Sequence, residues 1–329
     1  MTRKRWILWL GLMSLVAIGV VALSSGCSAA SSNWPTKAID LTISFAPGGG
    51  SDVAGRVMAK YLSAELKVPV NVVNKPGGNQ IPAVLSVLQS QPDGYTLLLD
   101  QPANSTIQNT LPDLPYKLED RSFGPMMVTG PNAYAINGKA PQNNMKEFID
   151  YYKAHPTELT WAGGSVSVSS FAFLQFFQAA GIDSTKVKEV QFDGIGPGNT
   201  AVAGGHVVLG GGGASSVVGM YKSKDLKVLA VTGDKRVPIL PDVPSGKELG
   251  LNLTMMNWFS ISGPKGLPKN VMDRLEEAAK KISQDPAFAK DCEQIASYPI
   301  YMSGADTKNY VLKEADDMKK LAASIGAKK

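Results

Sequence analysis

Three glycines separate an apolar run from a helical pattern in the segment SFAPGGGSDVAGRVMAKYLSAEL, residues 44–66. Backbone N–H groups in the first turn of a helix lack an acceptor within the helix, and the helix dipole adds a partial positive charge there. An anion can therefore bind where a strand enters a helix through glycines. Because glycine tolerates a positive φ, we place the left-handed residue of this turn at Gly50. The predicted anion site consists of Pro47, Gly48, Gly49, Gly50 and Ser51.

Further loops rich in glycine, serine and amide side chains lie where strand patterns give way to helix patterns. They are DQPANS (100–105), GGSVSVSS (163–170), FDGIGPGN (192–199) and GGGGASS (210–216). Each loop alone can be explained by glycine flexibility and serine capping. Ligands of open α/β sheets bind at the carboxyl ends of strands, where such loops converge, so together the loops favour one cleft ligand. The additional binding residues are predicted to be Gln101, Ser165, Ser167, Ser169, Asp193 and Gly212.

Catalytic and metal-binding patterns are incomplete in this sequence. A dinucleotide fingerprint starting at Gly48 would need a third glycine where Val53 stands, and the Gly-Lys-[Ser/Thr] ending of a P-loop is missing. Residues 163–167 lack the final glycine of a nucleophile elbow. The two histidines and two cysteines form neither an HxxxH nor a CxxC pattern. We therefore predict a protein that is not an enzyme and has no catalytic residue, cofactor or metal.

The start of the chain has the layout of an export signal. Basic residues at 3–5 precede an apolar run of 18 residues from Trp6 to Leu23, and LSSGC follows. Small residues before Cys27 resemble a lipoprotein signal, although Ser24 stands where that signal has leucine. Conventional cleavage nearby and an uncleaved helix are the alternatives, because 18 apolar residues are near the minimum for a bilayer span. We predict a signal peptide at 1–26, lipidation of Cys27 and a spacer at 27–33, outside the cytoplasm.

Composition describes a nearly neutral globular protein. The chain has 33 Lys and Arg against 28 Asp and Glu, and removing the three basic residues of the leader leaves 30 against 28, a net charge of +2. Aromatic residues do not interleave with basic patches, so we predict no nucleic-acid partner. If Cys27 is lipidated, Cys292 has no intramolecular partner, and its helical context predicts a buried small hydrophobe.

Strand and helix patterns alternate through most of the chain. Strands are expected at 39–46, 69–74 and 95–100 with helices at 51–66 and 81–91, and a second alternation runs from 145 to 233. Such βαβ units form a mainly parallel sheet. Residues 123–137 and 255–268 are expected to be extended crossing segments, followed by helices at 269–283, 286–295 and 307–325. We predict an α/β fold of two lobes, one from 34–130 plus 258–329 and one from 131–257.

A series of motifs resembles the Bug-type solute receptors of tripartite tricarboxylate transporters. These motifs are WPTKAIDLTISFAPGGGSDVAGR, VNKPGGN, QPDGYTLLL and LAVTGDKRVPILPDVPSGKELGL, in that order from Trp34 onward. The resemblance implies the two-lobed periplasmic-binding-protein type II fold, in which each lobe is a mainly parallel sheet flanked by helices. It also implies a carboxylate gripped by loop backbones and ordered waters.

Two departures from the family pattern concern the second lobe. Residues 167–172 lack the glycine and histidine of the family loop, and Gly212 replaces an acidic residue at a strand end. The resemblance then implies a more spacious wall that suits an ammonium group less. A di- or tricarboxylate or an aromatic carboxylate is favoured over an amino acid.

These features together predict an extracytoplasmic solute-binding protein for a tripartite tricarboxylate-type transporter. The expected partners are a small carboxylate, the membrane permease subunits and, through the lipid anchor, the membrane, with the receptor itself a monomer. The alternative is a ligand-sensing surface lipoprotein that signals to a partner, and a secreted enzyme using the same cleft is a third reading.

Overall fold

The computed structural model describes residues 34–111, 113–163, 167–192 and 194–324. The predicted signal peptide and spacer, with Cys27, lie outside the described residues. All named helices and strands belong to one compact unit, Pro35–Lys329. Across the described ranges, no helix is both long enough and apolar enough to cross a membrane.

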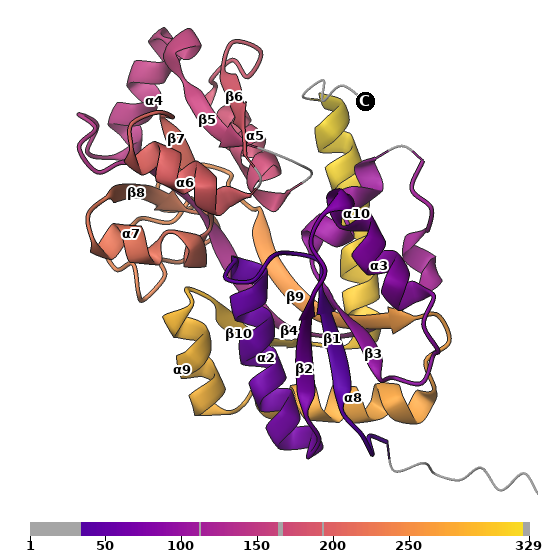
Figure 1. The fold of residues 1–329 in the computed structure, drawn as a ribbon. Coiled ribbons are helices and arrows are strands. Elements are labelled where there is room, and N and C mark those ends of the chain that lie inside the picture. The colour runs from indigo at the N-terminus through magenta and orange to yellow at the C-terminus, as the bar shows by residue number, and fades with distance from the viewer. Residues whose placement is uncertain (1–33, 112, 164–166, 193, 325–329) are drawn as a thin grey trace, which may run out of the picture. The chain divides into compact units, whose positions relative to one another are not determined.

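The first half of the unit contains strand β1, which the glycine turn follows, and the strands that pair next to it. Strand β1 pairs in parallel with β2 and β3, and β3 pairs antiparallel with β9. The strands and helices of this half, labelled in Figure 1, are β1 (Ile39–Ile43), α2 (Gly50–Leu66), β2 (Val70–Asn74), α3 (Ile81–Leu88), β3 (Thr96–Asp100), β9 (Met256–Pro264), α8 (Lys269–Ile282), α9 (Pro286–Gln294), β10 (Tyr298–Met302) and α10 (Gly304–Ser324).

The second half has its own set of strands and helices. Strand β5 pairs in parallel with β6 and β7. The elements of this half are α4 (Met145–Ala154), β5 (Thr160–Gly163), α5 (Val168–Ala180), β6 (Lys188–Gln191), α6 (Ile195–Ala203), β7 (Leu209–Gly213), α7 (Val218–Lys222) and β8 (Leu226–Val231). Short 3-10 turns connect elements in both halves, among them η1 (Gly78–Gln80), η2 (Pro102–Asn104), η3 (Gln108–Thr110), η4 (Leu118–Asp120), η5 (Pro156–Glu158) and η6 (Ala214–Ser216).

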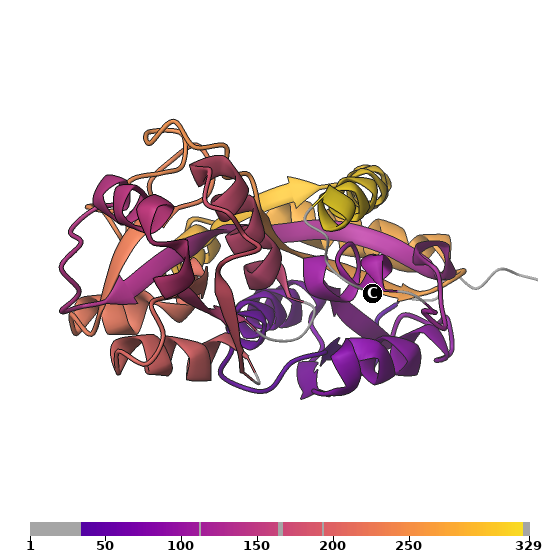
Figure 2. The same cartoon turned by 90° about the horizontal axis from the view of Figure 1, so that it is seen from above.

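One long strand joins the two halves. Strand β4 (Arg121–Asn137) pairs antiparallel with β9 and β10 in the first half and with β7 and β8 in the second. Figure 2 shows β4 running through both halves of the unit. The predicted two-lobed α/β architecture with extended crossing segments is therefore confirmed. The exact lobe boundaries, 34–130 plus 258–329 and 131–257, stay a prediction.

Aromatic side chains pack together in one core cluster of the second half. Helix α5 contributes Phe173, Phe176 and Phe177, which pack with Tyr134 of β4 and Trp161 of β5. The buried Tyr134 hydroxyl donates to Ala172 O at 3.0 Å, which satisfies its polar end. This packing fixes α5, and with it the N-cap residue Ser167, against β4.

The isolated cysteine of the described residues is part of the core. Cys292 of α9 is a free thiol that is fully buried. Burial raises the pKa of its thiol to about 12, which keeps it protonated. The prediction of a buried small hydrophobe is confirmed.

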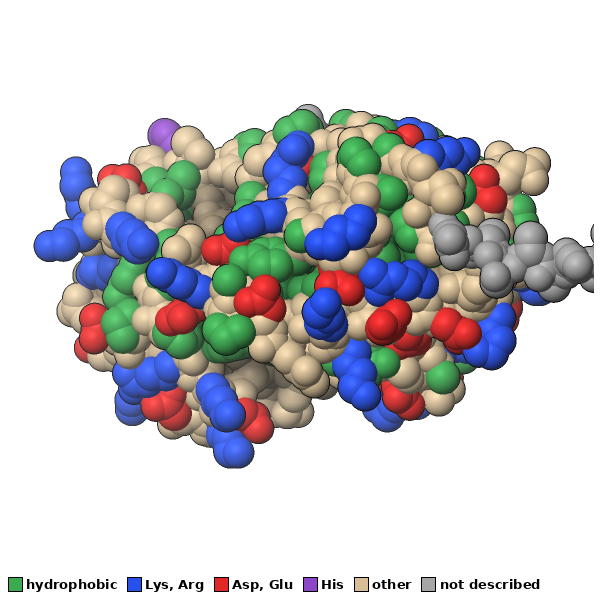
Figure 3. All heavy atoms as spheres, turned by 90° about the horizontal axis from the view of Figure 1, so that it is seen from below, with side chains coloured by type: hydrophobic (Ala, Val, Ile, Leu, Met, Phe, Trp, Pro, Cys, Tyr) green, Lys and Arg blue, Asp and Glu red, His purple; other side chains and the backbone are tan. Residues whose placement is uncertain are grey.

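Charged side chains of both signs are interspersed over the face shown in Figure 3, where neither sign forms a continuous patch.

Candidate functional site

A cavity of about 770 Å³ lies between the two halves, at the loop ends of the strands. All five loops that the sequence singled out contribute to its lining: 46–52, 100–105, 163–170, 192–199 and 210–216. Among the described residues that line it, none carries a charged side chain. The chain thus brings glycines, hydroxyls and amides from widely separated segments together in one pocket.

Most of the predicted binding residues lie in this lining. They are Pro47, Gly48, Gly49, Gly50, Ser51, Gln101, Ser167 and Ser169. Ser165 and Asp193 lie outside the described residues.

Gly212 does not line the cavity, which corrects the expectation of an open wall there. A Cβ at Gly212 would come within 2.7 Å of Ile195 Cγ1 and 2.8 Å of Ser169 Oγ. These two side chains therefore fill the space above Gly212. Its φ of +89° shows that glycine is needed there for the backbone.

The glycine turn leads directly into α2, as the sequence predicted. Gly49 is the N-cap residue and Gly50 begins the helix. The left-handed residue is Gly48, with φ +84°, so the expectation of a positive φ at Gly50 was wrong. A Cβ at Gly50 would instead lie 3.0 Å from Ser215 Oγ. Ser215 belongs to η6 of the second half, so both halves meet at the start of α2.

The buried carboxylate of Asp52 binds the backbone of the glycine turn. Its Oδ2 accepts from Gly48 N and from Arg56 Nε, each at 2.9 Å, and its Oδ1 accepts from Asn74 Nδ2 at 2.9 Å. The Gly48 N–H is thereby occupied. The N–H groups of Gly50 and Ser51, in the first turn of α2, have no acceptor within the helix and lie in residues that line the cavity.

Gln101 supplies a side-chain donor to the same cavity. Ser51 Oγ donates to Gln101 Oε1 at 2.6 Å, which occupies the carbonyl of the amide. Gln101 is 3% exposed, and its Nε2 has no hydrogen-bond partner among the described residues. A buried N–H₂ group without an acceptor is costly, so this group is suited to bind an acceptor on a ligand.

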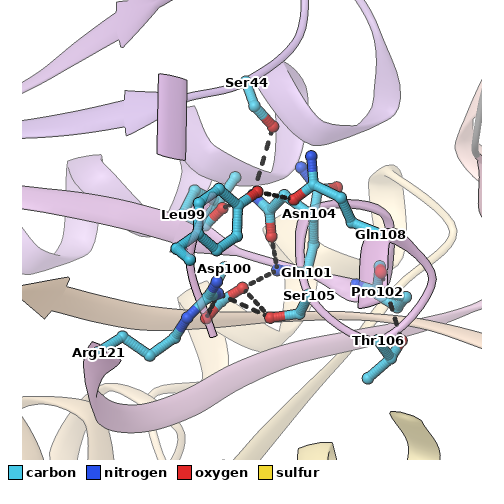
Figure 4. A network of polar contacts seen from close by, with 11 residues as sticks. Ser44, Leu99, Asp100, Gln101, Pro102, Asn104, Ser105, Thr106, Gln108 and Arg121 are labelled. Carbon is cyan, nitrogen blue, oxygen red and sulfur yellow. Dashed lines mark hydrogen bonds and ion pairs between the residues drawn. The ribbon is translucent and has the colours of Figure 1, made fainter. Parts of the chain in front are cut away.

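A buried polar network fixes the turn that carries Gln101. Asp100 Oδ2 accepts from Arg121 Nη1 at 2.8 Å, and Asp100 Oδ1 accepts from Ser105 Oγ at 2.6 Å and from Gln101 N at 3.0 Å. Asn104 Oδ1 also accepts from Gln101 N, at 3.0 Å. Figure 4 shows these side chains converging on the turn after β3. The position of Gln101 is therefore set by charged and amide groups behind the cavity wall.

The N-terminus of α5 contributes to the cavity wall from the second half. Ser167 is the N-cap of α5, where its Oγ accepts from Ser170 N at 3.2 Å. Ser167 Oγ also lies 3.1 Å from Ser170 Oγ, where either hydroxyl can donate, and Ser167 lines the cavity. Ser167 thus combines the capping role that serine often has with a place in the site.

Several lining residues were missed by the sequence prediction. Polar ones include Asn79, Gln80, Ser215 and Asn257, and large apolar ones include Phe45, Phe192, Ile195 and Phe259. The motif VNKPGGN had marked the neighbourhood of Asn79 only as a family resemblance. Phe192 and Ile195 lie in a loop that the sequence singled out, whereas Phe45 and Phe259 each resemble an ordinary core residue until the chain is folded.

Two lobes joined by crossing strands, with a cavity at the strand ends whose described lining residues carry no charge, define a solute-binding protein. The sequence profile of the tripartite tricarboxylate transporter family receptor matches residues 54–327, and this chain belongs to that family.

Similar sequences and structures span nearly the whole chain. Protein BugT of Bordetella pertussis is 26% identical over 320 residues, covering 95% of this chain and 98% of BugT. A protein from the gbd 5' region of Cupriavidus necator is 28% identical, covering 99% of this chain and 97% of its own length. The periplasmic binding protein BugD superposes with a TM-score of 0.79 at 25% identity, over 89% of this chain and 99% of BugD.

A further structure supports the fold alone. The Rhodopseudomonas palustris protein Rpa4515, solved with adipate, has a TM-score of 0.82 at 23% identity and covers 89% of this chain and 98% of its own. With these matches the predicted periplasmic-binding-protein type II fold is confirmed, and the family is one of solute-binding receptors.

Proposed function

We propose that this protein is an extracytoplasmic receptor that captures a small carboxylate in the cavity and delivers it to the permease subunits of a tripartite transporter. The observation that carries the proposal is the buried, unpartnered Nε2 of Gln101 beside the first turn of α2. Both features offer N–H donors to an anion without a cationic side chain.

The described lining residues offer a carboxylate several hydrogen-bond donors. A carboxylate would accept hydrogen bonds from the N–H groups of Gly49, Gly50 and Ser51 and from Gln101 Nε2. Ser167 and Ser169 would close the opposite side. Closure of the two lobes would expel water and strengthen these hydrogen bonds. Ser165, on loop 163–170, and Asp193, on loop 192–199, are also proposed as binding residues.

The size and lining of the cavity support a small organic acid. A volume of about 770 Å³ lies in the range of pockets for small molecules. Phe45, Phe192 and Phe259 offer apolar contacts beside the polar groups. A di- or tricarboxylate or an aromatic carboxylate fits this combination.

The setting of the receptor is part of the proposal. The family match supports a transporter partner, and the sequence before Trp34 supports export with a lipid anchor at Cys27. The receptor would act as a monomer, with ligand bound between lobes 34–130 plus 258–329 and 131–257.

A ligand screen tests the proposal. Thermal unfolding would be measured with mono-, di-, tri- and aromatic carboxylates, and hits confirmed by calorimetry. A ligand at 100 times its Kd should add about 2.7 kcal/mol of stability. The proposal fails if no carboxylate binds.

A substitution at the glycine turn tests the location of the site. Gly50→Val should weaken carboxylate binding by about tenfold or more. The valine side chain would press against Ser215 and cover the N–H groups at the start of α2. Gly219→Ala is the matched control, since a Cβ there meets no heavy atom of the described residues within 4 Å. Unchanged affinity in a folded Gly50→Val protein would place the ligand elsewhere.

A further inference from the structure

The turn between β2 and α3 has an unusual backbone. Four successive residues, 77–80, have positive φ angles, and the last two are Asn79 at +50° and Gln80 at +66°. A left-handed backbone is unfavourable for residues with a Cβ, and such strain persists only where the surroundings impose it. The turn lines the cavity throughout.

Two buried side chains hold this turn in place. Tyr116 OH donates to Gln108 Oε1, and Gln108 Nε2 donates to Asn79 O. Gln108 is fully buried, and burial raises the pKa of the Tyr116 hydroxyl, which keeps it protonated as a donor. The amide of Gln108 is therefore fixed in orientation, and it anchors the carbonyl next to Gln80.

Gln80 has a polar group that the protein leaves unused. Its side chain is 5% exposed, and its Oε1 has no hydrogen-bond partner among the described residues. Gln80 and Gln101 thus line one cavity with complementary unused groups, a carbonyl acceptor and an N–H₂ donor. A carboxylate satisfies the donor of Gln101 but has nothing to offer the acceptor of Gln80.

We infer that Gln80 is a specificity-determining residue whose side-chain carbonyl accepts a hydrogen bond from a hydroxyl of the ligand. The inference rests on the proposed function, since it concerns the same cavity and a carboxylate ligand. Carboxylates that carry a hydroxyl bind more tightly than their counterparts without one, because only they satisfy both amides. The turn held by Gln108 and Tyr116 positions Gln80 for this contact.

Matched ligand pairs test the inference by calorimetry. The pairs lactate and propionate, malate and succinate, and citrate and tricarballylate each differ by one hydroxyl. In the pair that binds best, the wild type should prefer the hydroxylated member about tenfold, the ratio that one hydrogen bond provides. Gln80→Met, which keeps the side-chain volume but removes the carbonyl, should lose this preference and keep its affinity for the member without the hydroxyl.

Two further variants separate the contact from backbone effects. Gln80→Gly should also lose the preference while it relieves the left-handed backbone, so its fold should be retained. Lys224→Gly is the control, because Lys224 has a φ of +64° and is not part of the cavity lining. It should keep the wild-type preference.

The outcomes distinguish this inference from the proposed function. Carboxylate binding without a preference for the hydroxylated member, or a preference that survives in Gln80→Met, overturns the role of Gln80 alone. Failure of every carboxylate to bind overturns the proposed function and this inference together.

Discussion

At the scale of single residues, a negative charge stands in the turn that is proposed to receive a negative ligand. Asp52 is 3% exposed and lies in the first turn of α2. Burial opposes its ionisation, but hydrogen bonds from Arg56, the Gly48 backbone and Asn74 outweigh burial and hold the pKa below its usual value. Its charge is thus compensated internally, and Asp52 orders the turn.

Asp52→Asn should make the stability of the protein less sensitive to acid. Because the folded-state pKa is lowered, the ionised carboxylate stabilises the fold above its unfolded pKa, about 3.9, and this stabilisation is lost as pH falls through the folded pKa. At pH 7 the free energy of unfolding of the variant should be about 1–3 kcal/mol lower than that of the wild type, the scale of hydrogen bonds to a charged group. Urea unfolding at pH 7 and pH 3 measures this. An equal loss at both values would show that the charge of Asp52 is unimportant.

At the scale of elements, the strand end that carries Gln101 depends on one ion pair. Asp100 of β3 and Arg121 of β4 are both completely buried, and Ser105 bridges them, with its Oγ 2.8 Å from Arg121 Nη1. A buried pair adds little net stability over a hydrophobic pair, but removal of one partner leaves an uncompensated charge. The pair therefore fixes the relative position of β3, β4 and the turn.

Arg121→Met should destabilise the fold by about 3–5 kcal/mol, because Asp100 would stay buried without its cation. The double variant Arg121→Met with Asp100→Asn removes the charge as well and should recover part of this loss. Chemical denaturation of the wild type and both variants measures the difference. A single variant that loses less than about 1 kcal/mol would mean that Asp100 finds another partner or is neutral.

The elements with strong periodicity were predicted well from the sequence. The helices expected at 51–66, 269–283 and 286–295 appear as α2, α8 and α9 within one or two residues. Strand β10 was missed because Pro299 interrupts its pattern, and its pairing with β4 is irregular. The loop expected at 192–199 contains the first residues of helix α6, which begins Ile-Gly-Pro-Gly and packs on β5 and β7.

At the scale of the whole molecule, the junction between the halves is tied to the cavity. Asn132 of β4 donates through Nδ2 to Met255 O at 2.8 Å, and its Oδ1 accepts from Asn257 Nδ2 at 2.9 Å. Thr232 Oγ1 also donates to Met255 O, at 2.7 Å. Asn257 lines the cavity, so a ligand there would contact the crossing segments directly.

The site was predictable where one loop contained all the information. The spacing of the glycines alone predicts the turn at the start of α2. The closeness of Gly50 to Ser215 depends on chain segments far apart in the sequence. Gln80 has a left-handed backbone next to the Asn79 carbonyl that Gln108 binds, and no propensity of glutamine indicates this conformation. For the same reason, the contacts that fill the space at Gly212 could not be foreseen.

The proposed attachment of the protein to a membrane depends on Cys27. Cys27 follows LSSG directly after the apolar run, and a spacer rich in serine and alanine separates it from Trp34. A thioether-linked lipid at Cys27 would hold the mature protein at a membrane while the folded unit captures ligand. Cys27→Ser should therefore move the protein from the membrane pellet to the soluble fraction after ultracentrifugation, with carboxylate affinity unchanged. The matched control is Cys292→Ala, which removes the other cysteine and should leave the protein in the pellet. A Cys27→Ser protein that stays in the pellet would identify the leader as an uncleaved helix.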